Sequence, residues 1–311
     1  MTGVAEISAA WAPAGAAVLL GVAAAAAALD GALAARADGR PLRAGVGLPV
    51  AETARLFRQR RRNTVSADVL LRWIGVGGLL VVALLKAAVV PLGGAVLADL
   101  PTGLVWFNAL DVTVWALVWL VGWGQNSAHA LVGGYRFLAQ ALAYELPLMF
   151  ALTAPAVAAA SLRPADIVAA QADLWFVLWM PVAFAVYCLA LVGFSVWGPL
   201  ETPVGADVAG GVLADLSGID RWLVLVGRWT LLTAGAAFGV TLFLGGGAGP
   251  LLPGWTWVLL KTAVLLAALV ALRRRLPALR PERIQAAAWL GALPLVLLQV
   301  LVVSVVVVGR S

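Results

Sequence analysis

Residues 286–308 read AAAWLGALPLVLLQVLVVSVVVV, an apolar run without a charged side chain. A helix needs about 20 mostly apolar residues to cross the hydrocarbon core of a bilayer, and this run is long enough. The whole chain has the same character, because 63% of its 311 residues are hydrophobic, 12% are charged and the mean hydropathy is +1.00. A soluble domain carries about 25% charged residues. The composition therefore indicates an integral membrane protein.

Working outward from this run, the sequence predicts an all-α, polytopic membrane helix bundle with about eight transmembrane helices. Strands of a membrane barrel would give shorter segments of alternating polarity. We expect one transmembrane domain over residues 1–311. The predicted spans are 14–33, 69–93, 103–123, 138–160, 175–197, 222–245, 255–272 and 286–308.

Arginine is unevenly distributed among the connections between these spans. Connection 34–68 carries eight arginines and 273–285 carries five, whereas 94–102 and 246–254 contain no lysine or arginine. Connections rich in Lys and Arg stay on the cytoplasmic side. We therefore expect a multi-pass protein of the cell membrane with both termini outside. The net charge of +6 then reflects orientation in lipid, and we expect no nucleic acid as a partner.

The connection 198–221 departs from this pattern, because it is acidic although it is expected to face the cytoplasm. It contains Glu201, Asp207, Asp215 and Asp220 against a single arginine, Arg221. Acidic residues count for little in membrane orientation. The predicted topology stands, and the acidic connection requires a separate explanation.

The sequence offers few ligands for a metal ion. His129 is the only histidine and Cys188 the only cysteine, and Cys188 lies within an apolar run where a small buried hydrophobic residue is expected. Protein zinc sites use several Cys and His ligands. We expect no metal site of this type, and we expect any redox cofactor to lie on a partner chain.

Ionisable residues at membrane depth are costly and are functional candidates by default. Glu145 lies seven residues into span 138–160, which is roughly 10 Å from the cytoplasmic end. Arg136, Gln140 and Tyr144 follow at intervals of four and form a polar stripe that leads to it. Two interpretations are open: a group that takes up and releases protons, or a structural hydrogen bond between helices.

Further candidates lie in other spans. Asp111 is in the middle of its span with Asn108 on the same face, and a proton relay and a helix–helix hydrogen bond are both open. Lys86 and Lys261 are the only lysines and lie toward the outer ends of their spans. A long lysine can snorkel to the interface, and the alternative is a proton-relay or counter-ion role. Arg228 is expected to snorkel or to meet the acidic connection.

Residues 99–150 resemble the quinone-site membrane subunit (the H subunit) of complex I, the proton-translocating NADH-quinone oxidoreductase. That family has a D-L-x-x-G-x-L segment, a helix, and then G-W-x-S-N, L-x-G-x-x-R, A-Q and S-Y-E. Weaker similarity covers Arg36 to Arg43, the segment LPVAETARLFR at 48–58 and the segment 201–218. The matching positions are Gly122, Trp123, Gln125, Asn126, Gly133, Arg136, Ala139, Gln140, Ala143, Tyr144 and Glu145.

The resemblance implies a membrane subunit that joins an electron-transfer arm to a membrane arm, with quinone as substrate. Flavin and iron–sulfur clusters would lie on partner subunits, with an iron–sulfur subunit at the cytoplasmic loops, so the chain would be part of an enzyme but not active alone. The residues implied in the quinone chamber are Arg36, Arg43, Glu52, Arg55, Arg136, Gln140 and Tyr144. Those of the proton path are Glu145 together with Asp111, Lys86 and Lys261, which we interpret as a rerouted path.

The chain also departs from the family pattern. Two glutamates of the family pattern correspond to positions near Val208 and Gly210, where this chain lacks them. A third family glutamate is replaced here by Arg228. These losses keep three alternatives open: the related membrane subunit of an energy-converting hydrogenase or formate hydrogenlyase, a scaffold that has lost proton pumping, and a secondary transporter. A transporter would have broken helices in paired halves around a midplane site.

Overall fold

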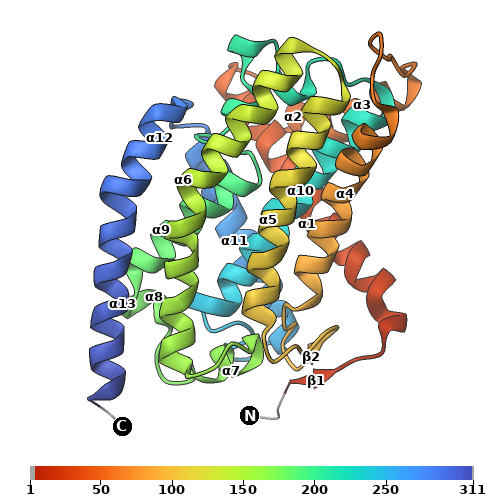
Figure 1. Cartoon of the computed structure of the whole chain (residues 1–311). Coiled ribbons are helices and arrows are strands. Elements are labelled where there is room, and N and C mark those ends of the chain that lie inside the picture. Colours follow the sequence, from red (N-terminus) through yellow and green to blue (C-terminus); the bar gives the residue numbers. More distant parts are fainter. Residues whose placement is uncertain (1–3, 310–311) are drawn as a thin grey trace.

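The computed structural model describes residues 4–309, which form a bundle of long, roughly parallel helices (Figure 1). Seven helical segments are long and apolar enough to cross a membrane. This confirms an all-α polytopic bundle. The segments are α1 (Ala12–Ala37), α4 (Val69–Ala88), α5 (Gly103–Gly124), α6 (Ala128–Ala159), α10 (Gly218–Phe243), α11 (Gly254–Arg273) and the continuous segment Glu282–Val308.

The eighth predicted span, 175–197, is not one helix. It divides into α8 (Phe176–Trp179) and α9 (Pro181–Phe194) at Met180, whose φ of −122° and ψ of 47° lie outside the α region. The cause is Pro181, because a proline disfavours the α conformation in the residue before it. The prediction of a continuous fifth span is therefore wrong.

Gln171 holds this broken segment in place from a fully buried position. Its side-chain oxygen accepts from the backbone nitrogens of Phe176 (3.3 Å) and Gly245 (2.9 Å). Its amide nitrogen donates to the carbonyl oxygens of Thr241 (2.9 Å) and Ile167 (3.1 Å). One side chain thus satisfies the backbone of three separate segments where a helix is missing.

The predicted connection 124–137 is also largely helical. Only residues 125–127 separate α5 from α6, and α6 has 32 residues. Such a helix is about 48 Å long, more than the roughly 30 Å hydrocarbon core. Arg136 therefore lies within α6 and not in a loop. Glu145 lies near the middle of the helix and not seven residues from its start.

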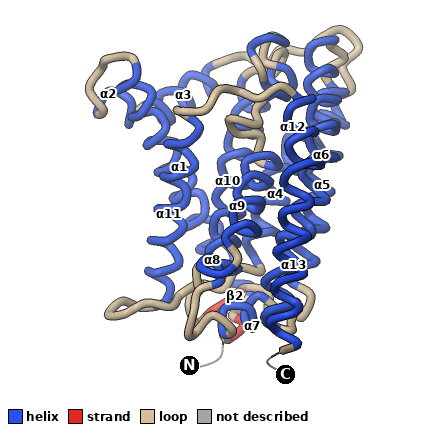
Figure 2. The backbone as a smooth tube through the Cα atoms, turned by 90° about the vertical axis from the view of Figure 1, so that its left-hand side faces the viewer, coloured by secondary structure: helices blue, strands red, loops and turns tan. Residues whose placement is uncertain are grey.

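The short elements close the two ends of the bundle. Strand β1 (Ala5–Glu6) pairs in parallel with β2 (Ala95–Val96) at the same end as the end of α13 (Leu293–Val308) (Figure 2). The opposite end holds α2 (Arg43–Val46), α3 (Leu48–Arg58) and α12 (Pro281–Ala287), whereas α7 (Pro164–Ala169) lies near the strands. A π-helical segment, Ala288–Ala292, joins α12 to α13. Which end faces the cytoplasm stays a prediction.

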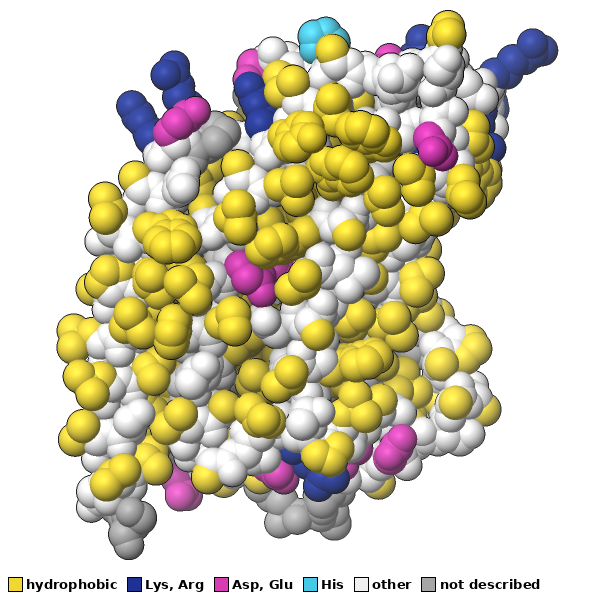
Figure 3. Space-filling view, viewed as in Figure 1, with side chains coloured by type: hydrophobic (Ala, Val, Ile, Leu, Met, Phe, Trp, Pro, Cys, Tyr) yellow, Lys and Arg dark blue, Asp and Glu magenta, His cyan; other side chains and the backbone are white. Residues whose placement is uncertain are grey.

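Charged side chains gather at the two ends, with a broad apolar belt between them that one acidic patch interrupts at mid-height (Figure 3). At the α2–α3 end, acidic residues pair with arginines. Asp220 pairs with Arg61 at 2.7 Å and Glu201 with Arg273 at 3.2 Å. This accounts for the acidic connection 198–221, whose carboxylates neutralise the arginines of neighbouring connections. Further pairs are Asp207 with Arg136 (2.7 Å), Asp30 with Arg273 (2.8 Å) and Asp30 with Arg274 (2.7 Å).

Helices α4 and α5 approach each other closely at Gly75. A Cβ atom on Gly75 would lie 2.7 Å from the carbonyl oxygen of Leu117 and 2.8 Å from the nitrogen of Val121. Both are backbone atoms and cannot move independently of α5. The absence of a side chain at Gly75 thus sets the α4–α5 spacing, as small residues do between membrane helices.

We therefore expect Gly75→Ala to lower the melting temperature of the full chain in mild detergent. Gly77→Ala is the matched control, because a Cβ atom at Gly77 meets nothing within 4 Å. The control should be neutral or stabilising, since alanine is about 1 kcal/mol better than glycine in a helix. Differential scanning fluorimetry would measure both, and equal melting temperatures would contradict the close-approach explanation.

Candidate functional site

A buried ion pair lies between α4 and α5. The Nζ atom of Lys86 is 2.8 Å from Oδ1 of Asp111, and both side chains are 0% exposed. Nζ also lies 4.3 Å from the ring centre of Phe107 and 4.0 Å from that of Phe194. The interpretation that Lys86 snorkels to the interface is therefore wrong, because its amino group points into the bundle.

Other polar side chains surround this pair. Asn108 donates from Nδ2 to Oε1 of Glu145 at 3.1 Å, which links α5 to α6. The charges of Asp111 and Lys86 both act on Glu145, and those of Asp111 and Glu145 act on Tyr144. We call this set the interior polar cluster. It comprises Lys86, Asn108, Asp111, Trp115, Tyr144 and Glu145.

The interior polar cluster is only partly satisfied. Within residues 4–309, Oδ2 of Asp111, Oε2 of Glu145, the hydroxyl of Tyr144 and Nε1 of Trp115 make no hydrogen bond of good geometry, although Tyr144 lies within reach of Trp115 and Asp111, and Glu145 lies within reach of Asp111. Buried polar atoms are normally paired, and each exception calls for an explanation. Two carboxylate oxygens and a hydroxyl with spare bonding capacity can accept water or a proton. Such an arrangement suits transfer better than a purely structural bond does.

The predicted stripe on α6 leads from one end of the bundle to this cluster. Arg136 pairs with Asp207 at 2.7 Å. One turn deeper, Gln140 donates to the carbonyl oxygen of Gly193 at 2.9 Å. Tyr144 packs against Gly193, because a Cβ atom added at Gly193 would lie only 2.7 Å from the Tyr144 ring. The stripe is thus continuous along α6, and its outer members also hold the neighbouring connection and α9.

The other predicted chamber residues lie on α1 to α3. Arg36 and Arg43 are exposed. Glu52 and Arg55 form an ion pair of 2.5 Å on α3, and the hydrogen bond from Arg55 holds the pKa of Glu52 below its usual value. The structure therefore divides the predicted chamber residues into two groups at the same end of the bundle, one on α1–α3 and one on α6.

Lys261 and Arg228 have contacts different from those expected. The Nζ atom of Lys261 donates to the carbonyl oxygens of Leu244 (2.6 Å), Gly246 (3.0 Å) and Ala248 (2.8 Å), and it lies over the Trp175 ring. Lys261 therefore caps the end of α10. Within residues 4–309 it forms no ion pair with a member of the interior polar cluster. Arg228 is buried, stacks on Trp197 and bonds to backbone carbonyls, so it does not snorkel.

The comparisons with known proteins agree with this architecture. The family model described as NADH dehydrogenase matches residues 14–304. The chain belongs to this family. An NADH-quinone oxidoreductase H subunit from Geobacter sulfurreducens is 33% identical over 83% of this chain and 82% of that protein. The H subunit from Cereibacter sphaeroides is 40% identical over 70% of this chain and 69% of that protein. The H subunit from Rhodopseudomonas palustris is 35% identical over 84% of this chain and 83% of that protein.

Membership in the NADH dehydrogenase family confirms the resemblance inferred from residues 99–150. The sequence did not reveal that Lys86 and Asp111 are partners. Lys86 and Asp111 lie inside consecutive spans, but the span of Lys86 also carries Arg72, so the sequence alone leaves the partner of Asp111 open. Among residues 4–309, no group of three or more His, Cys, Asp or Glu side chains is placed to hold a metal ion.

We expect Lys86→Met to destabilise the chain strongly, because it leaves the Asp111 carboxylate buried without its partner. Removing one member of a buried pair costs about 3–5 kcal/mol. The double variant Lys86→Met/Asp111→Leu should recover most of this loss, since replacing a whole buried pair by apolar residues is often neutral. Unfolding in mild detergent measures both, and additive losses in the double variant would contradict the pairing.

Proposed function

We propose that this chain is the membrane subunit of a complex I-type assembly and begins the path that couples quinone reduction to proton translocation. The observation that carries this proposal is the interior polar cluster. It brings titratable groups from three helices, α4, α5 and α6, within reach of one another at membrane depth. Ionisable chains of this kind mark proton relays in membrane proteins.

In this proposal the stripe on α6 connects the cluster to the arginine-rich end. A charge change near Arg136 and Gln140 acts on Tyr144 and Glu145 through successive turns of one helix. Glu145 exchanges the proton, and Asn108 orients its carboxyl group through the 3.1 Å hydrogen bond. Lys86 stabilises the Asp111 carboxylate, so that Asp111 acts on Glu145 as a fixed negative charge.

The quinone chamber is proposed at the arginine-rich end, in the cell membrane, with that end toward the cytoplasm and both termini outside. Arg36, Arg43, Glu52 and Arg55 would line it from α1–α3. Large hydrophobic residues are also exposed there, including Val50 (74%) and Phe57 (57%). We propose that an iron–sulfur subunit covers this surface and that flavin and the iron–sulfur clusters lie on partner subunits. The chain then works only within the assembly.

Among the alternatives, the names of the relatives favour a quinone oxidoreductase over a hydrogenase, because each relative cited is an H subunit of NADH-quinone oxidoreductase. The broken segment α8–α9 is the kind of feature expected in a transporter. No second broken span pairs with it in residues 4–309. A pair of such segments is what a transporter of inverted repeats requires.

The decisive variant is Glu145→Gln in the assembled complex. Glutamine keeps the shape and still accepts the hydrogen bond from Asn108, but it does not titrate. A structural role for Glu145 predicts little change. A relay role predicts that proton translocation falls about tenfold or more, in the range seen when an acid–base group is removed. Proton uptake and NADH:quinone activity should be measured together in reconstituted vesicles.

Gln299→Leu on α13 is the matched control, because Gln299 is also polar at membrane depth and bonds the carbonyl oxygen of Trp179 at 3.2 Å, away from the cluster. It should assemble and translocate protons at close to the normal rate. If Glu145→Gln assembles and keeps both rates within twofold of the parent, the relay is wrong. If only translocation fails while quinone reduction continues, Glu145 belongs to the proton path and not to the chamber.

A further inference from the structure

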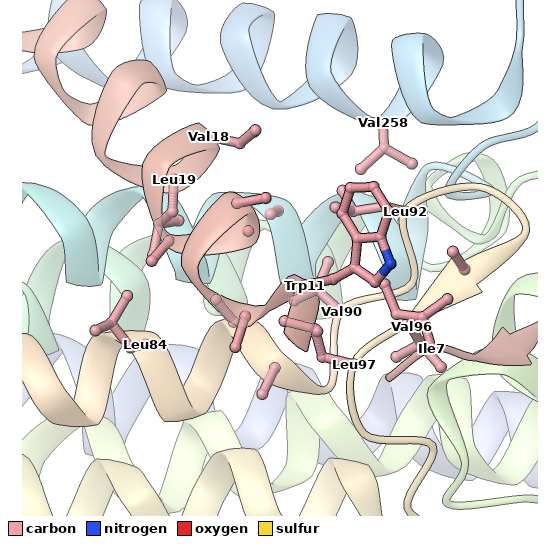
Figure 4. A pocket seen from close by; sticks show the side chains of 18 of the residues that line it. Ile7, Trp11, Val18, Leu19, Leu84, Val90, Leu92, Val96, Leu97 and Val258 are labelled. Carbon is pink, nitrogen blue, oxygen red and sulfur yellow. The ribbon is translucent and has the colours of Figure 1, made fainter. Parts of the chain in front are cut away.

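A cavity of about 580 Å³ lies between α1, α4, α10 and α11 at the end that holds the two strands. Figure 4 shows Leu19 and Leu84 toward one end of it, and Trp11, Leu92 and Val96 toward the other. None of the predicted chamber residues and no member of the interior polar cluster lines it. The cavity is therefore separate from the site described above.

The side chains that line the cavity do not provide a binding site for water. No charged side chain of the described residues lines the cavity. The hydroxyl of Thr233 is used by its own helix, where it donates to the carbonyl oxygen of Trp229 at 2.8 Å. The hydroxyl of Thr262, which is 2% exposed, has no partner within residues 4–309. A buried water needs two to four polar partners, and one hydroxyl does not supply them.

The cavity follows one face of α1. The residues Ala12, Gly15, Leu19 and Val22 line it from one face of α1, over a length of roughly 15 Å. The space is elongated along α1, as an extended alkyl chain is.

The surroundings of the cavity indicate the polar end of its occupant. Trp11 lines the cavity and is 62% exposed, and Trp255 nearby at the start of α11 is 54% exposed. Exposed tryptophans mark the level of lipid headgroups. The loops at this end carry Glu6, Asp99, Asp166 and Asp173, and their single arginine, Arg163, is already paired with Asp99 at 3.3 Å. Such a surface repels an anionic headgroup and attracts an amine.

We propose that the cavity holds an acyl chain of a zwitterionic phospholipid whose headgroup lies beside Trp11 and β1. The acyl chain follows the face of α1 from Ala12 to Val22 and seals the space between α1 and α11. Apolar burial supplies the attraction, since each methylene leaves contact with water or with mobile lipid for a fixed wall. This inference does not depend on quinone binding or on proton translocation.

The first experiment uses the wild-type complex in vesicles that contain phosphatidylethanolamine with a diazirine on its acyl chain. After photolysis in the presence of excess unlabelled lipid, we expect labelled peptides from residues 12–22 of α1 and from α11. Helix α13 is the internal control, because half of its residues are exposed and none of them lines the cavity. Labelling of α1 no higher than that of α13 would overturn the proposal.

The second experiment fills the cavity. Ala16→Phe and Ala237→Phe place a ring in it from two different walls, and Ala24→Phe is the matched control on the exposed side of α1. Native mass spectrometry of the assembled complex should show the loss of one retained phospholipid in the two filling variants and no loss in the control. Unchanged phospholipid retention in all three, or recovery of a quinone instead of a phospholipid, would show the assignment to be wrong.

Discussion

Within a hydrocarbon layer a charge must be neutralised by its neighbours, and Lys86 and Asp111 meet this requirement for each other. Their 2.8 Å contact is fully buried, so removing either side chain leaves its partner uncompensated at membrane depth. The pair fixes α4 against α5 at one depth, while Gly75 fixes the distance between the two helices higher up. The positions of Asn108 and, through it, Glu145 follow from that arrangement.

The same requirement explains features that look unrelated in the sequence. The amino group of Lys261 donates to three backbone carbonyls, and Arg228 bonds the carbonyls of the turn after α9. Gln171 bonds the backbone at the end of α10 and at the start of α8. Each is a polar side chain at membrane depth, and each satisfies backbone groups that no helix satisfies. The interior polar cluster is different, because its titratable side chains come from α4, α5 and α6 and act on one another. That difference separates a candidate relay from structural polar residues.

Much of this architecture could be predicted from hydropathy and from the motif at 99–150, because the length of apolar runs follows directly from the thickness of a bilayer. The start of α6 was missed because residues 128–137 are too polar for a hydropathy scan, although they are helical. Pro181 marks the break at Met180, but a proline alone does not predict a break, since Pro147 and Pro155 lie inside the continuous α6. The Lys86–Asp111 pair was not predictable either, because it depends on the rotation of two helices about their axes, which packing decides. The stripe from Arg136 to Tyr144 was found, since helical periodicity alone places those residues on one face.

The parallel pairing of β1 with β2 has a consequence for biosynthesis. Ala5 pairs with Ala95, so the strand ahead of α1 has no partner until α4 and the segment after it have been made. At about 5–20 residues per second, this delay is roughly 5–20 s. During that interval the backbone groups of residues 5 and 6 depend on water or lipid headgroups. The first strand therefore has to wait at the membrane surface, on the side where the α4–α5 hairpin later delivers its turn.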